Sequence, residues 1–403
     1  MRHSVNKMEQ SFKEKYFYAY KLLNDCLPIY ALYAVLFREK GLSLTEISLL
    51  FSLWSFVALV SEVPSGVLAD RWNRKYLICI AVVLKSICFI IWYFSDTFFM
   101  FGAGFVFWGI AGSFTSGTEE GLVYDNLKSE SRENEFTKIY GKGRFFSSLG
   151  VIAGVVSGGI LAYFIPISVI SIMSALILVV CFLFALQLKE KNYYSDRLKK
   201  EKSGYFKTLF EATGLCVKNS KIFIGMILLV FIFGITGYSD EYDALIISDF
   251  GLDYIWLSII FGIRFICIAI GSRFADAVDK KINIKNKTFL LGSAGGVFLL
   301  FFSRVWNSHA LVIFGIFCMF ITIAEIIQIN IVQGEINEEG RATVMSLLGV
   351  CQNIAMILFS LTYAALSNGY RLKTLYAFIS LYCIAGTALL FFINTMVKKR
   401  RTV

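Results

Sequence analysis

Several ionisable residues lie inside long apolar stretches of the sequence, and four of them are the side chains best suited to chemistry. Asp25, Glu120 and Glu325 are acids, and Arg264 is a base. A charge at mid-membrane costs about 2.5–3.5 kcal/mol on insertion scales, so it needs a partner or a wet cavity, and such acids often relay protons. We therefore predict that at least one of the three acids carries a proton, with Glu325 ranked first. Arg264 lies at a similar depth to Glu325 and is predicted to pair with it in a cavity.

Simpler structural interpretations exist for two of these acids, Asp25 and Glu120, and for other charges in these stretches. Asp25 lies one helical turn from Lys21 and can pair with it. Glu62 and Lys85 lie at similar depth on either side of a helix turn and can form a second structural pair. Glu120 lies close enough to the end of its stretch to stay hydrated. These alternatives compete with the proton-carrying hypothesis.

Other kinds of chemistry have no support in the sequence. The nine cysteines form no CxxC pair and show no ligand spacing with His3 or His309, the two histidines. No phosphate-binding Gly-rich loop occurs, and no Ser/His or His/Asp arrangement stands out. We expect neither a catalytic set nor a metal nor a cofactor.

The elements that position the charges are twelve apolar stretches of about 20 residues, each long enough to cross about 30 Å of hydrocarbon as a helix. Of the 403 residues, 57% are hydrophobic and 17% charged, whereas soluble domains carry about 45–50% and about 25%. Only three prolines occur, which favours long unbroken helices. The predicted fold class is an all-α membrane protein with twelve transmembrane helices, near residues 16–37, 44–69, 76–95, 98–124, 143–164, 167–187, 222–245, 253–275, 288–304, 309–333, 342–367 and 374–397.

Basic residues indicate the orientation of these helices. With the N-terminus inside, 31 Lys and Arg fall in cytoplasmic segments and five in external loops. Lys and Arg collect on the cytoplasmic side of membrane proteins. Both termini are therefore predicted to be cytoplasmic in a multi-pass protein of the cell membrane. The net charge of +10 is explained in this way, without nucleic-acid binding.

The chain is predicted to consist of two six-helix halves, residues 1–187 and 222–403. The segment between them, residues 188–221, is polar and holds nine Lys and Arg. It is predicted to be a cytoplasmic linker, and residues 204–217 can form an amphipathic helix on the membrane surface. An internal repeat supports the two halves, because GVLAD with the following RK at residues 66–75 recurs 206 residues later as SRFAD with KK.

The most specific motif is GVLADRWNRK at residues 66–75. It resembles the G-x-L-A-D-R-x-G-R-K loop of the major facilitator superfamily, with Asn73 in the place of a glycine. The glycine would allow close helix approach, and the arginine can hold a carboxylate bidentately. The resemblance implies a gating latch, with a helix 4 acid as the partner, formed by Gly66, Asp70, Arg71, Arg74, Lys75 and Asp125.

The fifth apolar stretch carries glycines at a second family spacing. They resemble the antiporter motif G-x8-G-x3-G-P-x2-G-G, with Val155 in the place of proline, and are Gly141, Gly150, Gly154, Gly158 and Gly159. In the family this motif marks exporters, although small residues also serve ordinary helix packing. Residues 62–66, 116–125 and 341–343 are similar to those of Gram-positive-type efflux permeases.

These observations predict a secondary transporter. The resemblance implies proton-coupled export of a small amphipathic compound or peptide by a monomer in the lipid bilayer, with a substrate site between the halves. Uptake on the same fold is one alternative, because only the helix 5 glycines favour export. A receptor or assembly factor that kept the fold without transport is another, and the latch residues argue against it.

Overall fold

The computed structural model describes residues 12–190, 213, 214, 216, 219–281, 287–335, 338–367 and 371–401. Every element in these ranges is a helix, which confirms the predicted all-α class. The chain divides into two compact units, one of residues 1–43 and 53–202 and the other of residues 44–52 and 203–403. Most of the predicted linker 188–221 and its surface helix falls outside the described residues and stays a prediction.

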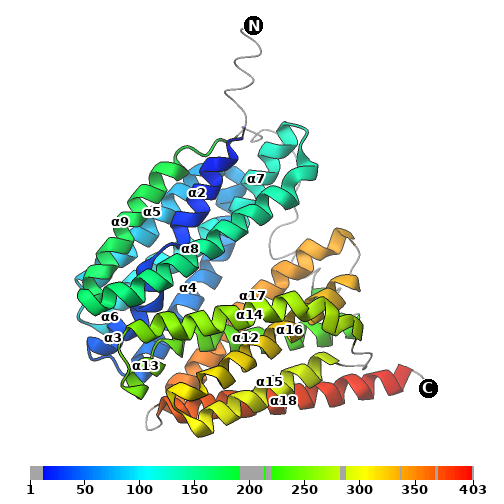
Figure 1. The fold of residues 1–403 in the computed structure, drawn as a ribbon. Helices are drawn as coiled ribbons and strands as arrows, with labels where there is room; N and C mark the ends of the chain where they lie inside the picture. The colour runs from blue at the N-terminus through cyan, green and yellow to red at the C-terminus, as the bar shows by residue number, and fades with distance from the viewer. Residues whose placement is uncertain are drawn as a thin grey trace. The chain divides into compact units, whose positions relative to one another are not determined.

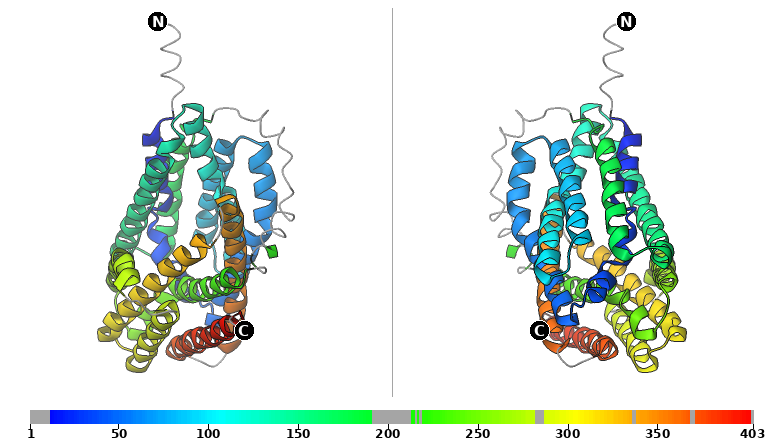
Figure 2. Two further views of the ribbon diagram at one scale, coloured as in Figure 1. Left: turned by 90° about the vertical axis from the view of Figure 1, so that its right-hand side faces the viewer. Right: turned by 90° about the vertical axis from the view of Figure 1, so that its left-hand side faces the viewer.

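The first unit is a bundle of long helices joined by short connections (Figure 1). α5 packs between α6 and α9, and α2 packs against α8 and α9. In both views of Figure 2 the helices of this unit run side by side. The elements are α2 (Glu14–Asp25), η1 (Pro28–Ala31), α3 (Tyr33–Glu39), α4 (Leu44–Arg71), α5 (Arg74–Tyr93), α6 (Phe98–Thr115), α7 (Thr118–Ser129), η2 (Glu133–Glu135), α8 (Phe136–Phe164) and α9 (Ile167–Ala185). Residues 44–52 of α4 are assigned to the second unit.

The first predicted span, residues 16–37, is interrupted. The α-helix α2 ends at Asp25, the short 3-10 helix η1 follows, and α3 completes the crossing. Pro28 explains the interruption, because its ring nitrogen carries no hydrogen and the carbonyl of Asn24, four residues earlier, loses its helical donor. The prediction of unbroken helices is wrong for this span.

The fourth predicted span, residues 98–124, is interrupted as well. α6 ends at Thr115 and α7 begins at Thr118. Between them Gly117 has a φ of 66°, a left-handed conformation that glycine adopts without steric cost. The first turn of α7 contains Glu119 and Glu120, where the positive end of the helix dipole favours acids. The prediction of unbroken helices is wrong for this span, because Gly117 allows the backbone to leave the helical conformation.

The second unit is built in the same way from long helices. α14 and α15 pack on α16, α15 also packs on α18, and α12 contacts α16, α17 and α18. The elements are α12 (Ser220–Asp243), α13 (Ile246–Phe250), α14 (Ile255–Lys281), α15 (Lys287–Val305), η3 (Ser308–Ala310), α16 (Leu311–Gly334), α17 (Glu338–Ser367) and α18 (Leu372–Arg401).

Within the described residues, ten helical segments are long and apolar enough to cross a membrane. Two predicted spans are not among them. The span at 16–37 is divided by its break, and that at 222–245 contributes only the shorter apolar segment Ser220–Val230. The twelve predicted spans fit this pattern, because both missing stretches are helical along most of their length.

Candidate functional site

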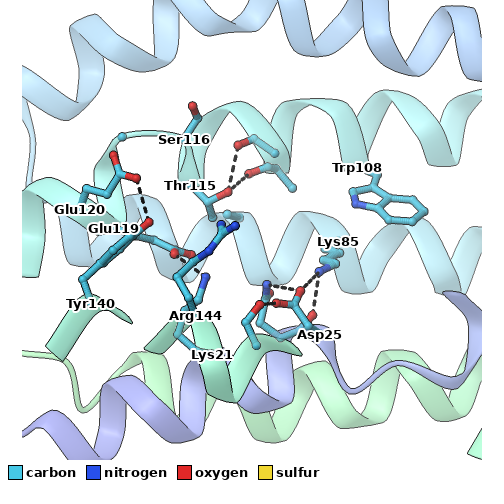
Figure 3. Close-up of a pocket in the computed structure, with 16 residues that line it drawn as sticks. Lys21, Asp25, Lys85, Trp108, Thr115, Ser116, Glu119, Glu120, Tyr140 and Arg144 are labelled. Atoms are coloured by element: carbon cyan, nitrogen blue, oxygen red, sulfur yellow. Dashed lines mark hydrogen bonds and ion pairs between the residues drawn. The ribbon is translucent and has the colours of Figure 1, made fainter. Parts of the chain in front are cut away.

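A cavity of about 420 Å³ opens in the first unit beside both helix breaks. Its walls come from α2, α5, α6, α7 and α8, and Figure 3 shows its polar side chains converging from these helices. The charged residues that line it are Lys21, Asp25, Lys85, Glu119, Glu120 and Arg144. Irregular backbone at membrane depth is tolerated where it is buried in protein or lines a cavity. The two breaks and the cavity therefore form one site.

Lys85 replaces the hydrogen bond that Pro28 cannot supply. Its Nζ donates to the carbonyl oxygen of Asn24 at 2.7 Å and lies 3.8 Å from the carboxylate of Asp25. The ammonium also lies 5.2 Å from the ring centroid of Tyr30. A cation at the C-terminal end of a helix is stabilised by the exposed carbonyls and the dipole. Lys85 thus compensates both the broken end of α2 and the acid that ends it.

Two further contacts hold the break in place. The backbone N–H of Ile29 donates to Ser174 Oγ on α9 at 3.1 Å. Ser147 on α8 donates its hydroxyl hydrogen to the Asp25 carboxylate. Freed backbone groups in membrane helices need such partners, because hydrocarbon offers none.

Lys21 and Glu119 form a buried ion pair on the other side of the cavity. Lys21 Nζ lies 2.8 Å from one Glu119 oxygen, and the Tyr20 hydroxyl donates to the other at 2.6 Å. Both charged side chains are 9% exposed. Glu119 is therefore the deeply buried acid of this segment, whereas the predicted candidate Glu120 is exposed and accepts a hydrogen bond from the Tyr140 hydroxyl at 2.8 Å.

The two structural pairs expected from the sequence are wrong. Lys21 bonds to Glu119 and not to Asp25, because α2 ends at Asp25 and the carboxylate faces Lys85 and Ser147. Glu62 accepts a hydrogen bond from the Ser116 hydroxyl at 3.1 Å, while Lys85 is engaged at the helix break. The helix break, absent from the prediction, redirects both cations.

The buried pair makes a stability prediction. Lys21→Met is expected to lower the free energy of unfolding by about 3–5 kcal/mol, because it leaves Glu119 buried without its cation. The double variant Lys21→Met with Glu119→Gln is expected to recover most of this loss, since the uncompensated charge is removed. Denaturant unfolding of the purified protein in detergent measures both. A single variant as stable as the wild type would show that the pair does not stabilise the unit.

The glycines of α8 face the broken first span. A Cβ on Gly150 would lie 2.3 Å from the Leu22 oxygen, one on Gly154 2.6 Å from the Leu27 nitrogen, and one on Gly158 2.2 Å from the Pro28 oxygen. These are backbone atoms, which cannot move aside as a flexible side chain can. Gly159 is also buried, whereas a Cβ on Gly141 would meet nothing within 4 Å. The stripe serves close packing of α8 on the break.

The structure describes contacts for three of the predicted latch residues, Arg74, Lys75 and Asp125. Arg74, the first residue of α5, lies with its Nη1 2.8 Å from Asp125 Oδ2 on α7. A Cβ on Gly121 would lie 2.2 Å from the Arg74 guanidinium, so a glycine is needed there. The Lys75 backbone N–H donates to Glu190 at 3.1 Å. These contacts hold the start of α5 against α7.

The remaining latch residues give less support. A Cβ built on Gly66 would meet nothing within 4 Å, so close helix approach does not require glycine there in this conformation. The side chains of Asp70 and Arg71, like those of residues 341–343, lie outside the described set.

In the second unit, Arg264 pairs with a different acid from the one predicted. Its guanidinium contacts the carboxylate of Asp243 at the end of α12, and the Tyr376 hydroxyl donates to the same carboxylate at 2.8 Å. Asp243 is fully buried. The predicted Arg264–Glu325 pair is wrong. A buried carboxylate needs a cation nearby, and Arg264 is the cation that pairs with Asp243. Glu325 is half-buried on α16 and forms no hydrogen bond or ion pair with the described residues.

A second cavity, of about 680 Å³, lies within the second unit between α12, α17 and α18. Its lining is almost entirely apolar, for example Leu358, Phe359 and Ile379, and includes no charged side chain. Of these two cavities, the one in the first unit therefore holds the charged groups able to recognise a polar ligand.

Sequence reasoning missed Glu119, Trp108, Asp243 and the role of Lys85 at the break. The signals were present but weak. Pro28 after Asp25 marks the first break, and the pair Ser116–Gly117 marks the second. Acids directly after such a break fall in the first turn of a new helix, which identifies Glu119 together with Glu120.

Comparisons with known proteins agree with this architecture. The family model described as Major Facilitator Superfamily matches residues 24–360. Among curated proteins, no sequence matches the chain. The crystal structure of the nucleoside transporter NupG is similar with a TM-score of 0.77 and 15% sequence identity, over 94% of this chain and 98% of that chain. A bacterial homologue of the human lysosomal transporter Spinster, inward-facing and occupied, gives a TM-score of 0.70 and 13% identity, over 95% and 96%. Identities this low show a shared fold alone.

Proposed function

Because the chain belongs to the Major Facilitator Superfamily, we propose that it is a secondary active transporter that exchanges protons for a small amphipathic compound or peptide and exports it. The observation that supports this proposal is the charged cavity beside two interrupted spans. Transporters place substrate and coupling-ion sites near the membrane midplane at discontinuous helices. The site is reached from each side in turn, and both termini lie in the cytoplasm of a cell-membrane protein.

The direction of transport rests on the glycines of α8. The glycines of α8 suggested export, yet Gly150, Gly154 and Gly158 are required for packing against the first span. That observation favours a second candidate, proton-coupled uptake on the same fold. Accumulation of labelled compounds in everted vesicles distinguishes the two. Accumulation driven by a proton gradient in everted vesicles supports export. Accumulation driven by a proton gradient in intact cells supports uptake. If neither is observed, a receptor without transport is the remaining alternative.

Glu325 is proposed as the coupling acid. It is a half-buried carboxyl group on a membrane helix that forms no ion pair with the described residues, so protonation is the route to neutrality that remains. Asp25, beside Lys85, and Glu120, beside Tyr140, are the other two candidates. Asp25 and Glu120 line the cavity of the first unit, whereas Glu325 lies on α16 of the second unit.

Replacing the coupling acid with its amide is expected to abolish substrate-linked proton movement. Glu325→Gln is expected to have this effect, and Asp25→Asn and Glu120→Gln serve as comparisons. Glu133→Gln, at an exposed acid in the first position of η2, is the matched control and is expected to behave as the wild type. Substrate-induced proton release in vesicles is the measurement. If all three amide variants still move protons in step with substrate, the coupling proposal is wrong.

A further inference from the structure

Two of the three basic side chains in the cavity of the first unit already have acidic partners. Lys21 pairs with Glu119 at 2.8 Å, and Lys85 is held by Asp25 and the end of α2. Arg144 on α8 differs. Its side chain is exposed to the cavity and forms no hydrogen bond or ion pair with the described part of the chain. A guanidinium with its planar donors available is suited to binding a carboxylate bidentately.

The acid without a cationic partner in the cavity is Glu120. The one contact given for its side chain among the described residues is the neutral hydroxyl of Tyr140, which donates to it at 2.8 Å. Tyr140 and Arg144 are four residues apart on α8 and therefore lie on the same face of the helix. The cavity thus presents one negative group and one positive group that form no ion pair with each other in the described part of the chain.

A flat aromatic surface lines the other end of the cavity. Figure 3 shows Trp108 beyond Lys85, Glu120 and Tyr140 at the opposite end, and Arg144 between them. The ring of Trp108 stacks on Tyr30 with centroids 5.5 Å apart and planes 1° from parallel. It is packed against further rings, among them Trp92 at 5.7 Å. Phe105 also lies parallel to it, with planes 8° apart. A ring held in this way offers a ligand a fixed apolar contact that loses little conformational freedom on binding.

We infer that the cavity binds a zwitterion of the amino-acid type with a ring-bearing side chain, with its carboxylate on Arg144, its ammonium at Glu120 and its side chain directed toward Trp108. Arg144 lies between the other two groups in Figure 3, as the carboxylate-bearing carbon lies between the amine and the ring in such a compound. A simple anion would leave Glu120 without a ligand group of opposite charge, and a simple cation would leave Arg144 without one. The volume of about 420 Å³ falls within the usual range of about 300–1,000 Å³ for small-molecule sites. This inference rests on the proposed transport function and names its substrate class.

Equilibrium binding to the purified full-length protein in detergent tests the inference without a transport step. The probes are L-phenylalanine, its methyl ester without the negative charge, N-acetyl-phenylalanine without the positive charge, and L-alanine without the ring. Phenylalanine is expected to bind about tenfold or more tightly than each of the other three, because each lacks one of the matched groups. Arg144→Gln and Glu120→Gln are each expected to weaken phenylalanine binding by about tenfold or more. Lys138→Gln removes the same charge from an exposed position of α8 and is expected to change nothing.

The outcomes separate this inference from the proposed function. Phenylalanine binding that depends on Arg144 and Glu120 supports the site even if no flux is found, in which case transport alone is refuted. Preferred binding of the ester or of the N-acetyl compound would overturn the zwitterion assignment. Absence of binding by every probe would overturn it as well, and proton-linked flux of other compounds in the same preparation would leave the transport proposal standing.

Discussion

Arg74→Ala is expected to leave the protein folded in the membrane and to reduce transport to about one-tenth or less. The side chain connects the start of α5 to Asp125 on α7 at 2.8 Å and lies over Gly121. A charge-assisted hydrogen bond of this kind contributes about 1.5–3 kcal/mol. If the contact is needed in one of two alternating states, its loss shifts their equilibrium by about tenfold or more. Asp125→Asn is expected to reproduce the effect, since it removes the other half of the same contact. Asp70→Asn in the same loop is also expected to abolish transport.

The internal repeat supplies a matched control for this prediction. Lys280 stands 206 residues after Arg74, and its ion pair with Asp276 at 2.8 Å is exposed, with both side chains about three-quarters accessible. Exposed pairs contribute about 0–1 kcal/mol. Lys280→Ala is therefore expected to transport normally. Substrate flux and the amount of folded protein in the membrane are measured for each variant. Normal transport by both Arg74→Ala and Asp125→Asn would refute the latch.

Gly158→Ala is expected to destabilise the first unit, whereas Gly141→Ala on the same helix is not. The added methyl at residue 158 would lie 2.2 Å from the Pro28 carbonyl oxygen, so α8 must move away from the break. Overpacking of this kind costs about 1–3 kcal/mol. At residue 141 the methyl meets nothing within 4 Å, and alanine favours a helix over glycine by about 1 kcal/mol.

Thermal unfolding of the two alanine variants in detergent measures this difference. The family motif treats the two glycines alike, so the comparison also tests which of them the fold requires. Equal unfolding temperatures for Gly158→Ala and the wild type would show that α8 does not pack on the break as described.

The fold could be predicted from the sequence because apolar stretches of the right length repeat along the chain. The length of an apolar stretch can be read from the sequence without knowing which residues it contacts. Ten of the twelve stretches correspond to candidate spans within the described residues. Length alone does not reveal a break inside a stretch. Pro28 and Gly117 interrupt spans at the points where the cavity forms, and the count of prolines across the chain says nothing about where each one lies.

The partners of the buried charges could not be predicted in the same way. Depth along a helix suggested Arg264 with Glu325, yet depth does not specify which face of a helix a side chain occupies. Arg264 contacts Asp243, an acid near the end of the predicted span 222–245. Lys85 was assigned to Glu62 on the same reasoning and instead serves a backbone carbonyl. The Arg74–Asp125 contact was accessible to prediction because a family motif, and not depth, named both residues.

The central claim is that a proton gradient drives a small molecule through this protein, and reconstitution tests it most directly. The purified chain is placed in liposomes with a pH difference across the membrane, and the accumulation of a labelled ring-bearing zwitterion is followed with and without a protonophore. The account predicts accumulation against the concentration gradient that collapses when the protonophore is added and is absent in Glu325→Gln. Accumulation that persists unchanged after the pH difference is removed, or is equal in liposomes without the protein, would contradict it.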